Sequence, residues 1–297
     1  MITSRFAQMV EVKYPIIGAP MFLVSYEDLV VEVSEAGALG TFPLPNYFTI
    51  EELKQALNNI KEKTSNPIGV NIQLHGRFPW KEQMKVCLDY GVKCFITSLG
   101  DPSLIIKDVH ANGGIVLADV VNLKQALKAQ DAGVDGLIAV GHGAGGHGGT
   151  ISTMVLVPYL VKNTNLPILA AGGIATGRQM AAALALGADG VVVGTRLIAT
   201  YEAKAALEYK NEVIKADPED IVFSSEITGN RASWLASSLN RLKENPDLIT
   251  EKWKEVWSAG QTVAQVEGLM GARQVIEEIV EECINTVNNL VNLFRSQ

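Results

Sequence analysis

The sequence predicts an α/β fold, a (β/α)₈ TIM barrel followed by a C-terminal helical extension or lid. Short runs rich in Val and Ile alternate with longer amphipathic stretches, which is typical of a parallel sheet covered by helices. The number of runs reaches eight, and the 297 residues leave some tens beyond a barrel of about 250 residues. Eight such runs favour a closed barrel over an open doubly wound sheet.

Each predicted strand is an apolar run of the length expected for a buried strand. In chain order the predicted strands are Pro15–Ala19, Leu39–Phe42, Ile68–Asn71, Cys94–Thr97, Ile115–Asp119, Gly136–Val140, Ile168–Ala171 and Gly190–Val193. Several of the intervening helices have start signals. Ser25, Thr49 and Asp101 each fit an N-cap before an acidic or proline-led first turn.

The alternation ends at about Tyr201, where the sequence becomes helical. Residues 262–293 carry apolar positions at helical spacing, so one or two closing helices are expected there. The predicted organisation is a barrel over residues 1–200, a helical insertion or lid over 201–260, and closing helices over 261–297 that pack back on the barrel.

Composition and charge exclude several classes of protein. Hydrophobic residues make up 47% and charged residues 19%, which suits a compact enzyme rather than a disordered chain. The net charge of -7 and the lack of a Lys/Arg cluster argue against a nucleic-acid partner. No apolar run approaches the roughly 20 residues that span a bilayer, and no secretory signal is visible, so we expect a cytoplasmic protein. The three cysteines lack C-x-x-C spacing and are expected to be reduced thiols.

Two glycine turns carry the most specific chemical signal. The seventh and eighth predicted strands end at Gly172-Gly173 and at Gly194-Thr195, the usual phosphate site of a TIM barrel. Glycine lets a phosphate reach backbone N–H groups, and the next helix N-terminus adds positive potential. These four residues are the predicted cradle; the alternative is that the glycines only form turns.

A glycine-rich loop, Gly141–Gly149, follows the sixth predicted strand and contains His142 and His147. Such a loop has little intrinsic order, so a ligand would explain two imidazoles at the C-terminal end of a strand. Histidine can act there as acid, base or hydrogen-bond donor. The pair lacks a third metal ligand in the loop, so no metal site is predicted.

Met21 and Asn71 are further candidates at the ends of the first and third predicted strands. Met is usually core filler, but Met21 would face a ligand at the barrel mouth. Asn71 lies among apolar neighbours, and a buried amide needs hydrogen-bond partners, such as a ligand ring with donors and acceptors. The alternative for Asn71 is a turn-capping role.

A series of short motifs is spread over nearly the whole chain. The motifs are Gly18-Ala-Pro-Met21, Ala36-Gly-Ala-Leu-Gly40, Gly69-Val-Asn71, Ala144-Gly-Gly-His-Gly148, Ala170-Ala-Gly-Gly-Ile174, Ala182–Ala188, Gly194-Thr195, Thr228-Gly229 and Trp257-Ser-Ala-Gly-Gln261. In this order they resemble the nitronate monooxygenase family, also called 2-nitropropane dioxygenases. The sequence departs from many members at Val140 and Gly143, where Gln and an acidic residue are usual.

The resemblance implies an oxidoreductase with FMN bound non-covalently at the C-terminal ends of the barrel strands. With Gly172 of the cradle, the implied flavin contacts are Ala19, Met21, Asn71, Gly145, Gly173, Val193, Gly194 and Thr195. The implied catalytic residue is His147, and His142 is expected to be a solvated loop residue.

The resemblance also implies the reaction, in which an alkyl nitronate and dioxygen give a carbonyl compound and nitrite. Related families leave an alternative, an FMN- and NAD(P)H-dependent enoyl-[acyl-carrier-protein] reductase or NAD(P)H:quinone reductase. A flavin-binding protein without turnover is the second alternative. The oligomeric state is left open, with a homodimer as one option.

Overall fold

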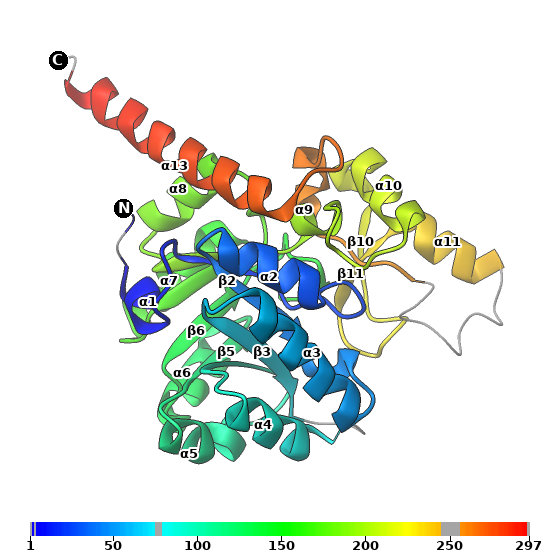
Figure 1. The fold of residues 1–297 in the computed structure, drawn as a ribbon. Helices are drawn as coiled ribbons and strands as arrows, with labels where there is room; N and C mark the ends of the chain where they lie inside the picture. The colour runs from blue at the N-terminus through cyan, green and yellow to red at the C-terminus, as the bar shows by residue number, and fades with distance from the viewer. Residues whose placement is uncertain (1, 3, 75–78, 245–255, 296–297) are drawn as a thin grey trace.

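The computed structural model describes residues 2, 4–74, 79–244 and 256–295. Eight parallel strands close into a barrel in the order β1-β2-β3-β4-β5-β6-β8-β9 (Figure 1). The strands are β1 Ile16–Gly18, β2 Leu39–Pro43, β3 Ile68–Gln73, β4 Cys94–Ser98, β5 Ile115–Val120, β6 Gly136–Val140, β8 Ile168–Ala171 and β9 Gly190–Val193. Pairing of Ile17 in β1 with Val192 in β9 closes the ring. The predicted barrel and all eight predicted strands are confirmed.

Helices surround the barrel, and α1 packs against its interior. They are α1 Arg5–Met9, α2 Glu27–Glu35, α3 Ile50–Lys63, α4 Trp80–Asp89, α5 Ser103–Ala111, α6 Leu123–Ala132, α7 Thr153–Asn163, α8 Gly177–Ala185 and the short α9 Thr195–Ile198, with the 3₁₀ turn η1 Leu44–Asn46 after β2. Thr49 caps α3 as predicted, in a capping box with Glu52. The N-cap of α5 is Pro102, one residue after the predicted Asp101, although Asp101 accepts a hydrogen bond from the Ser103 N–H there.

The Ser25 prediction was wrong by one residue, because Tyr26 is the N-cap of α2. The Ser25 hydroxyl is fully buried and serves the preceding turn instead. It donates to the Ala19 carbonyl oxygen and accepts from the Met21 N–H. Ser25 therefore fixes the loop after β1 rather than the helix.

The barrel interior contains its own core, separate from the layer between strands and helices. It includes Ile17, Leu39, Cys94, Ile96, Leu117, Ile138, Leu169 and Val192, and Phe6 of α1 packs with them. Because side chains alternate along a strand, Asn71, Ser98 and Asp119 lie on this same inner face, one step further toward the C-terminal ends of β3, β4 and β5. Polar groups therefore replace apolar ones at the C-terminal mouth of the barrel.

The chain beyond the barrel adds a second small sheet and two helices. Strands β10 Ile221–Ser224 and β11 Ala232–Leu235 pair antiparallel, and β11 also pairs with β7 Gly146–His147. They stand with α10 Leu207–Lys215, the 3₁₀ turn η2 Pro218–Asp220 and α11 Ala236–Glu244 at the right of Figure 1. Trp234 is fully buried in the small core of this part. The sequence predicted helices here but not β10 and β11.

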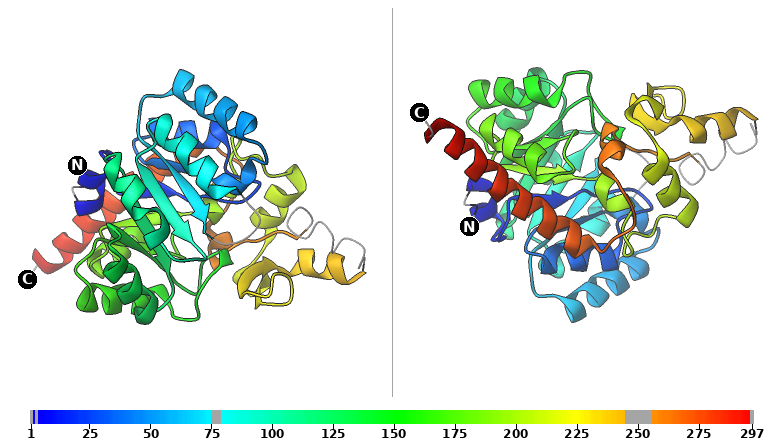
Figure 2. Two further views of the ribbon diagram at one scale, coloured as in Figure 1. Left: turned by 90° about the horizontal axis from the view of Figure 1, so that it is seen from below. Right: turned by 90° about the horizontal axis from the view of Figure 1, so that it is seen from above.

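The chain closes with the 3₁₀ helix η4 Gln261–Gln265 and the long helix α13 Ala272–Arg295. The first half of α13 packs along α8 and α2, and its second half runs past the barrel (Figures 1 and 2). Among the described residues, no helix is long and apolar enough to cross a membrane. All three cysteines are buried, so they belong to the core.

Candidate active site

The loops that follow the barrel strands meet at one mouth, and the turn after β8 contains two adjacent glycines. Gly172 and Gly173 both have left-handed backbone angles, with φ of +89° and +80°. A Cβ on Gly172 would lie 2.6 Å from the Ala144 N atom, whereas a Cβ on Gly173 would meet nothing within 4 Å. Gly172 is thus required by packing, and Gly173 faces open space.

The end of β9 lies beside the end of β1. The Ala19 N–H donates to the Val193 carbonyl oxygen at 2.9 Å. A Cβ on Gly194 would lie 3.4 Å from the Ala19 Cβ and 3.9 Å from the Met21 sulfur. Four of the residues predicted to contact flavin are therefore together: Ala19, Met21, Val193 and Gly194. The Val193 side chain points into the outer core, so a ligand could meet only its main chain.

Unpaired backbone donors mark this part of the mouth. Within the described part of the chain, the N–H groups of Gly172, Gly173, Gly194 and Thr195 donate to no acceptor. The first turn of α8 is already closed by a capping box between Thr176 and Gln179. The three glycines are half-buried, so their N–H groups remain accessible, and open donors at adjacent strand ends fit an anion.

A segment from the far end of the chain, residues 258–261, supports the glycine loop after β6. The Gly260 N–H donates to Thr195 Oγ1 at 2.9 Å, and the Gln261 N–H donates to the Gly143 carbonyl oxygen at 3.1 Å. The Gly146 N–H donates to Ser258 Oγ at 2.6 Å. A Cβ on Gly145 would lie 2.9 Å from the Gly260 N atom, so close backbone packing explains that glycine.

His147 lies on β7, opposite Ala232 of β11, and its Nε2 is 3.2 Å from Thr228 Oγ1. The Thr228 hydroxyl donates its hydrogen to the Asn230 carbonyl oxygen, so it can only accept from His147. We therefore assign the proton of the neutral ring to Nε2, which leaves the lone pair on Nδ1.

His142 is held differently. Its ring packs edge-on against Phe223 of β10, with centroids 5.2 Å apart. The backbone N–H of His142 donates to the Ile151 carbonyl oxygen. The expectation of a solvated loop residue was wrong, because the sheet β10-β11-β7 half-buries this ring. His142 thus joins the glycine loop to the added sheet.

On the opposite side of the mouth, three strands present a chain of polar groups. Asn71 Nδ2 donates to the Ile96 carbonyl oxygen at 3.1 Å and to Ser98 Oγ at 2.7 Å. Ser98 in turn donates to Asp119 Oδ2. Both amide hydrogens of Asn71 are therefore taken by protein, and its carbonyl oxygen is the group that could accept from a ligand.

Asp119 is the functional candidate that sequence reasoning missed. Desolvation raises the pKa of its carboxyl group to about 6, and the Ser98 hydroxyl only partly opposes this shift. Solvent nevertheless reaches the side chain through the mouth. The signal was available: Asp119 lies two residues after Leu117 on a predicted barrel strand, so it shares the inner face.

The described residues contain no group of three His, Cys, Asp or Glu side chains that could hold a metal ion.

The family model described as nitronate monooxygenase matches residues 3–77 and 73–275. The chain belongs to the nitronate monooxygenase family. It is an oxidoreductase by that membership, and the resemblance drawn from the motifs is confirmed.

Two kinds of relative are similar to this family member. A Staphylococcus saprophyticus protein named probable nitronate monooxygenase is 27% identical, over 97% of this chain and 99% of its own length. The structure of FabK from Thermotoga maritima is 31% identical with a TM-score of 0.89, covering 99% of this chain and all of FabK. A nitroalkane oxidase from Streptomyces ansochromogenes, at 24% identity, a TM-score of 0.83 and coverage of 96% and 99%, shares the fold.

Proposed function

We propose that this chain is an FMN-dependent nitronate monooxygenase, which oxidises alkyl nitronates with dioxygen to a carbonyl compound and nitrite. The observation that carries the proposal is the set of open backbone donors at Gly172, Gly173, Gly194 and Thr195. They lie at the ends of the last two barrel strands, the position at which TIM barrels commonly hold a phosphate.

The residues present fit a flavin mononucleotide. The phosphate would be held by the four N–H groups, and the open side of Gly173 gives it room. Met21 and Ala19 would supply apolar contacts beside it, and the Asn71 carbonyl oxygen would accept an N–H from the ring system. Bound FMN would accept electrons from the substrate and pass them to dioxygen. The protein's own part is to bind, to orient and to manage protons.

We assign the proton transfer to His147. Its Nε2 donates to Thr228, which orients the ring, and the imidazole would accept a proton from the substrate carbon of a neutral nitroalkane. A preformed nitronate has already lost that proton, and His147 would then act by hydrogen bonding. Thr228 would act as a positioning residue, because it fixes the tautomer rather than the substrate.

A second candidate function is an NAD(P)H-dependent reductase of the enoyl-[acyl-carrier-protein] or quinone type. It is favoured by the similarity to FabK over the whole of both chains. The net charge of -7 argues against an acidic carrier protein as the partner, since such a partner needs a basic docking surface. We therefore rank this candidate second.

The two functions are separated by the electron donor. The purified protein, loaded with FMN and kept anaerobic, is mixed with an alkyl nitronate in one cuvette and with NADH or NADPH in another. We expect the nitronate to reduce the flavin, so that the yellow colour of the oxidised flavin is lost. Bleaching by the nucleotide alone would refute the monooxygenase and support the reductase.

The phosphate site is tested by Gly173→Asp, with Gly91→Asp as the matched control. Both glycines have left-handed angles, φ +80° and +83°, and both have open space at the Cβ position. Because the φ angles are similar, both variants carry about the same backbone strain. Gly91 follows α4 at the opposite end of the barrel, far from the proposed phosphate. We expect only Gly173→Asp to lose FMN, because its carboxylate would occupy and repel the phosphate. Equal flavin content in the two variants would show that the phosphate does not bind at Gly173.

A further inference from the structure

The polar chain of Asn71, Ser98 and Asp119 at the mouth lacks hydrogen-bond donors for a ligand. The Asn71 amide donates both of its hydrogens to protein, to the Ile96 carbonyl oxygen and to Ser98. The Ser98 hydroxyl has one hydrogen and donates it to Asp119 Oδ2. When Asp119 is ionised, the three side chains therefore offer a ligand only acceptors.

Asp119 is open to a ligand on its other oxygen. Its Oδ1 has no hydrogen-bond partner among the described residues, and the residue is exposed in the mouth. Leu117 precedes it on the same face of β5, and the neighbouring strand β6 presents Ile138 and Val140. Because these neighbours are apolar, a ligand that enters the mouth would cover the carboxyl group and remove its water.

The charged side chains around Asp119 have other surroundings. Asp101, which follows β4, pairs with Lys128 of α6, and Lys124 at the start of α6 is exposed. His147 of the glycine loop is held on the added sheet. Within the part of the chain that the structure describes, burial and one hydrogen bond are the causes of the raised pKa of Asp119, and no charged side chain is among them. What covers Asp119 thus decides its protonation.

A flavin ring needs donors at this side of the mouth, and this step rests on the proposed FMN function. One edge of the oxidised ring carries an N–H between two carbonyl groups. The Asn71 carbonyl oxygen can accept from the N–H, but a ring carbonyl oxygen that is buried without a donor costs free energy. Strands β3 and β5 are two strand spacings apart, about 10 Å along the wall, and both side chains point inward. Asn71 and Asp119 can therefore contact the same ring.

We infer that Asp119 binds the flavin ring as a neutral carboxylic acid, which donates its hydrogen from Oδ1 to a ring carbonyl oxygen. Its Oδ2 still accepts from Ser98, so the polar chain is preserved. The proton comes from water as FMN covers the side chain, and each FMN that binds takes up one proton at a pH at which the free Asp119 is ionised. FMN binding is therefore tighter at low pH.

The first test measures the affinity of the FMN-free protein for FMN between pH 5 and pH 8, from the change in flavin fluorescence. Asp119→Asn keeps an acceptor for Ser98 and has an N–H that donates at every pH. We expect the two proteins to bind FMN similarly at pH 5. Above about pH 6 the wild type should weaken relative to the variant by about tenfold per pH unit. The ratio is compared because the phosphate of FMN also titrates at about pH 6 in both complexes.

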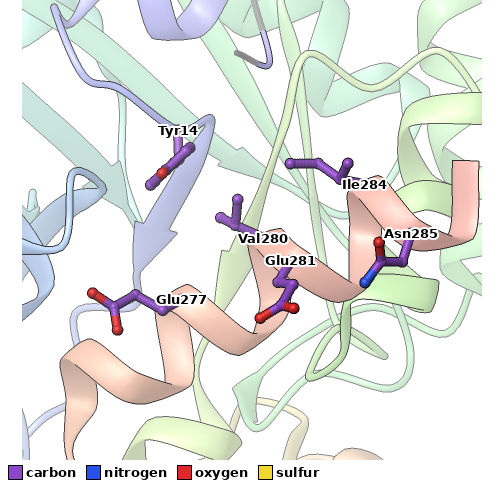
Figure 3. Close-up of a pocket in the computed structure, with 6 residues that line it drawn as sticks. All are labelled: Tyr14, Glu277, Val280, Glu281, Ile284 and Asn285. Atoms are coloured by element: carbon purple, nitrogen blue, oxygen red, sulfur yellow. The ribbon is translucent and has the colours of Figure 1, made fainter. Parts of the chain in front are cut away.

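A pocket outside the mouth supplies the control for a lost negative charge. It has a volume of about 270 Å³ and lies between Tyr14 and α13, where its lining on the helix is Glu277, Val280, Glu281, Ile284 and Asn285 (Figure 3). Glu281 is exposed, so Glu281→Gln removes one carboxylate without changing the mouth. This variant should follow the wild type at every pH.

The outcomes of the first test separate this inference from the proposed function. A ratio that stays constant from pH 5 to pH 8, or weaker binding by Asp119→Asn at pH 8, would overturn the role of Asp119 and leave an FMN-binding protein. Failure of the wild type to bind FMN at any pH would overturn both.

The second test counts the protons. Calorimetric titration in buffers of different ionisation enthalpy gives the number of protons taken up per FMN bound. At pH 7 we expect the wild type to take up close to one proton more than Asp119→Asn. Riboflavin, which lacks the phosphate, should give the same difference with weaker affinity. Equal proton uptake by the two proteins would overturn the inference even if their affinities differ.

Discussion

The raised pKa of Asp119 predicts how much the variant Asp119→Asn changes the free energy of unfolding. Replacement by Asn removes the charge and keeps a group that can accept from Ser98. The rise in the pKa of Asp119 from 3.8 to about 6 corresponds to about 3 kcal/mol of differential stability. Solvent reaches this side chain and screens the effect, so we reduce the expectation by half, to about 1.5 kcal/mol.

The direction of the effect follows from proton linkage. The folded state holds the proton more tightly than the unfolded state, so between pH 3.8 and about 6 it binds more protons. The contribution of Asp119 to stability is therefore fully present below pH 3.8 and is lost as the pH rises through 6. Above about pH 7 the ionised carboxylate destabilises the fold by its full amount. Asp119→Asn should thus be more stable than the wild type at neutral pH and similar to it at low pH.

The assay is urea unfolding of the wild type and Asp119→Asn from pH 4 to pH 8, with matched flavin content. We expect the variant's advantage to grow between pH 4 and 6 and to become constant at about 1.5 kcal/mol, or roughly 3–6 °C in Tm. Asp131→Asn on the exposed surface of α6 is the control and should show no such advantage. An advantage independent of pH, or a less stable Asp119→Asn at pH 8, would refute the reasoning.

Two further predictions concern the glycine loop and α13. His147→Asn should keep FMN and lower turnover by about 10²–10⁴, more with a neutral nitroalkane than with its nitronate, whereas His142→Asn should have a smaller effect in the same steady-state assay. Full activity of His147→Asn on both substrates would refute the assignment. Gly177→Ala should lower the free energy of unfolding by about 1–3 kcal/mol in urea, because the new Cβ would overlap the α13 backbone at Ile279 and Cys283. Gly268→Ala, with open space, is its control, and equal midpoints would contradict the packing argument.

The barrel could be predicted because each strand carries its own signal. Runs such as Ile115–Asp119 and Gly190–Val193 are apolar, short and bounded by turn residues, so their count alone gives the architecture. Strands β10 and β11 could not be predicted in this way. Each has four residues, and β11 is followed directly by α11, so its apolar positions read as part of the helix. The pairing of β11 with β7 is a long-range contact that no local pattern contains.

The candidate site was predicted in part for the same reason. Glycines at strand ends indicate an open backbone. Gly194 does lie beside Ala19 and Met21, and Gly172 and Gly173 follow the neighbouring strand β8. The chain from Asn71 through Ser98 to Asp119 depends on the register of three strands, which a single sequence does not reveal. The Thr228 contact that selects the tautomer of His147 spans 81 positions and is equally invisible.

The bonds from residues 258–261 to Thr195 and to the glycine loop have a consequence for synthesis in the cell. All eight barrel strands are complete once residue 193 has been made, but Gly260, which binds Thr195, is made 65 residues after Thr195. At the usual rate of about 5–20 residues per second, the barrel exists for several seconds without the support of its glycine loop. During that interval the mouth is unfinished on the ribosome. The glycine loop thus gains this support only in the last stage of synthesis.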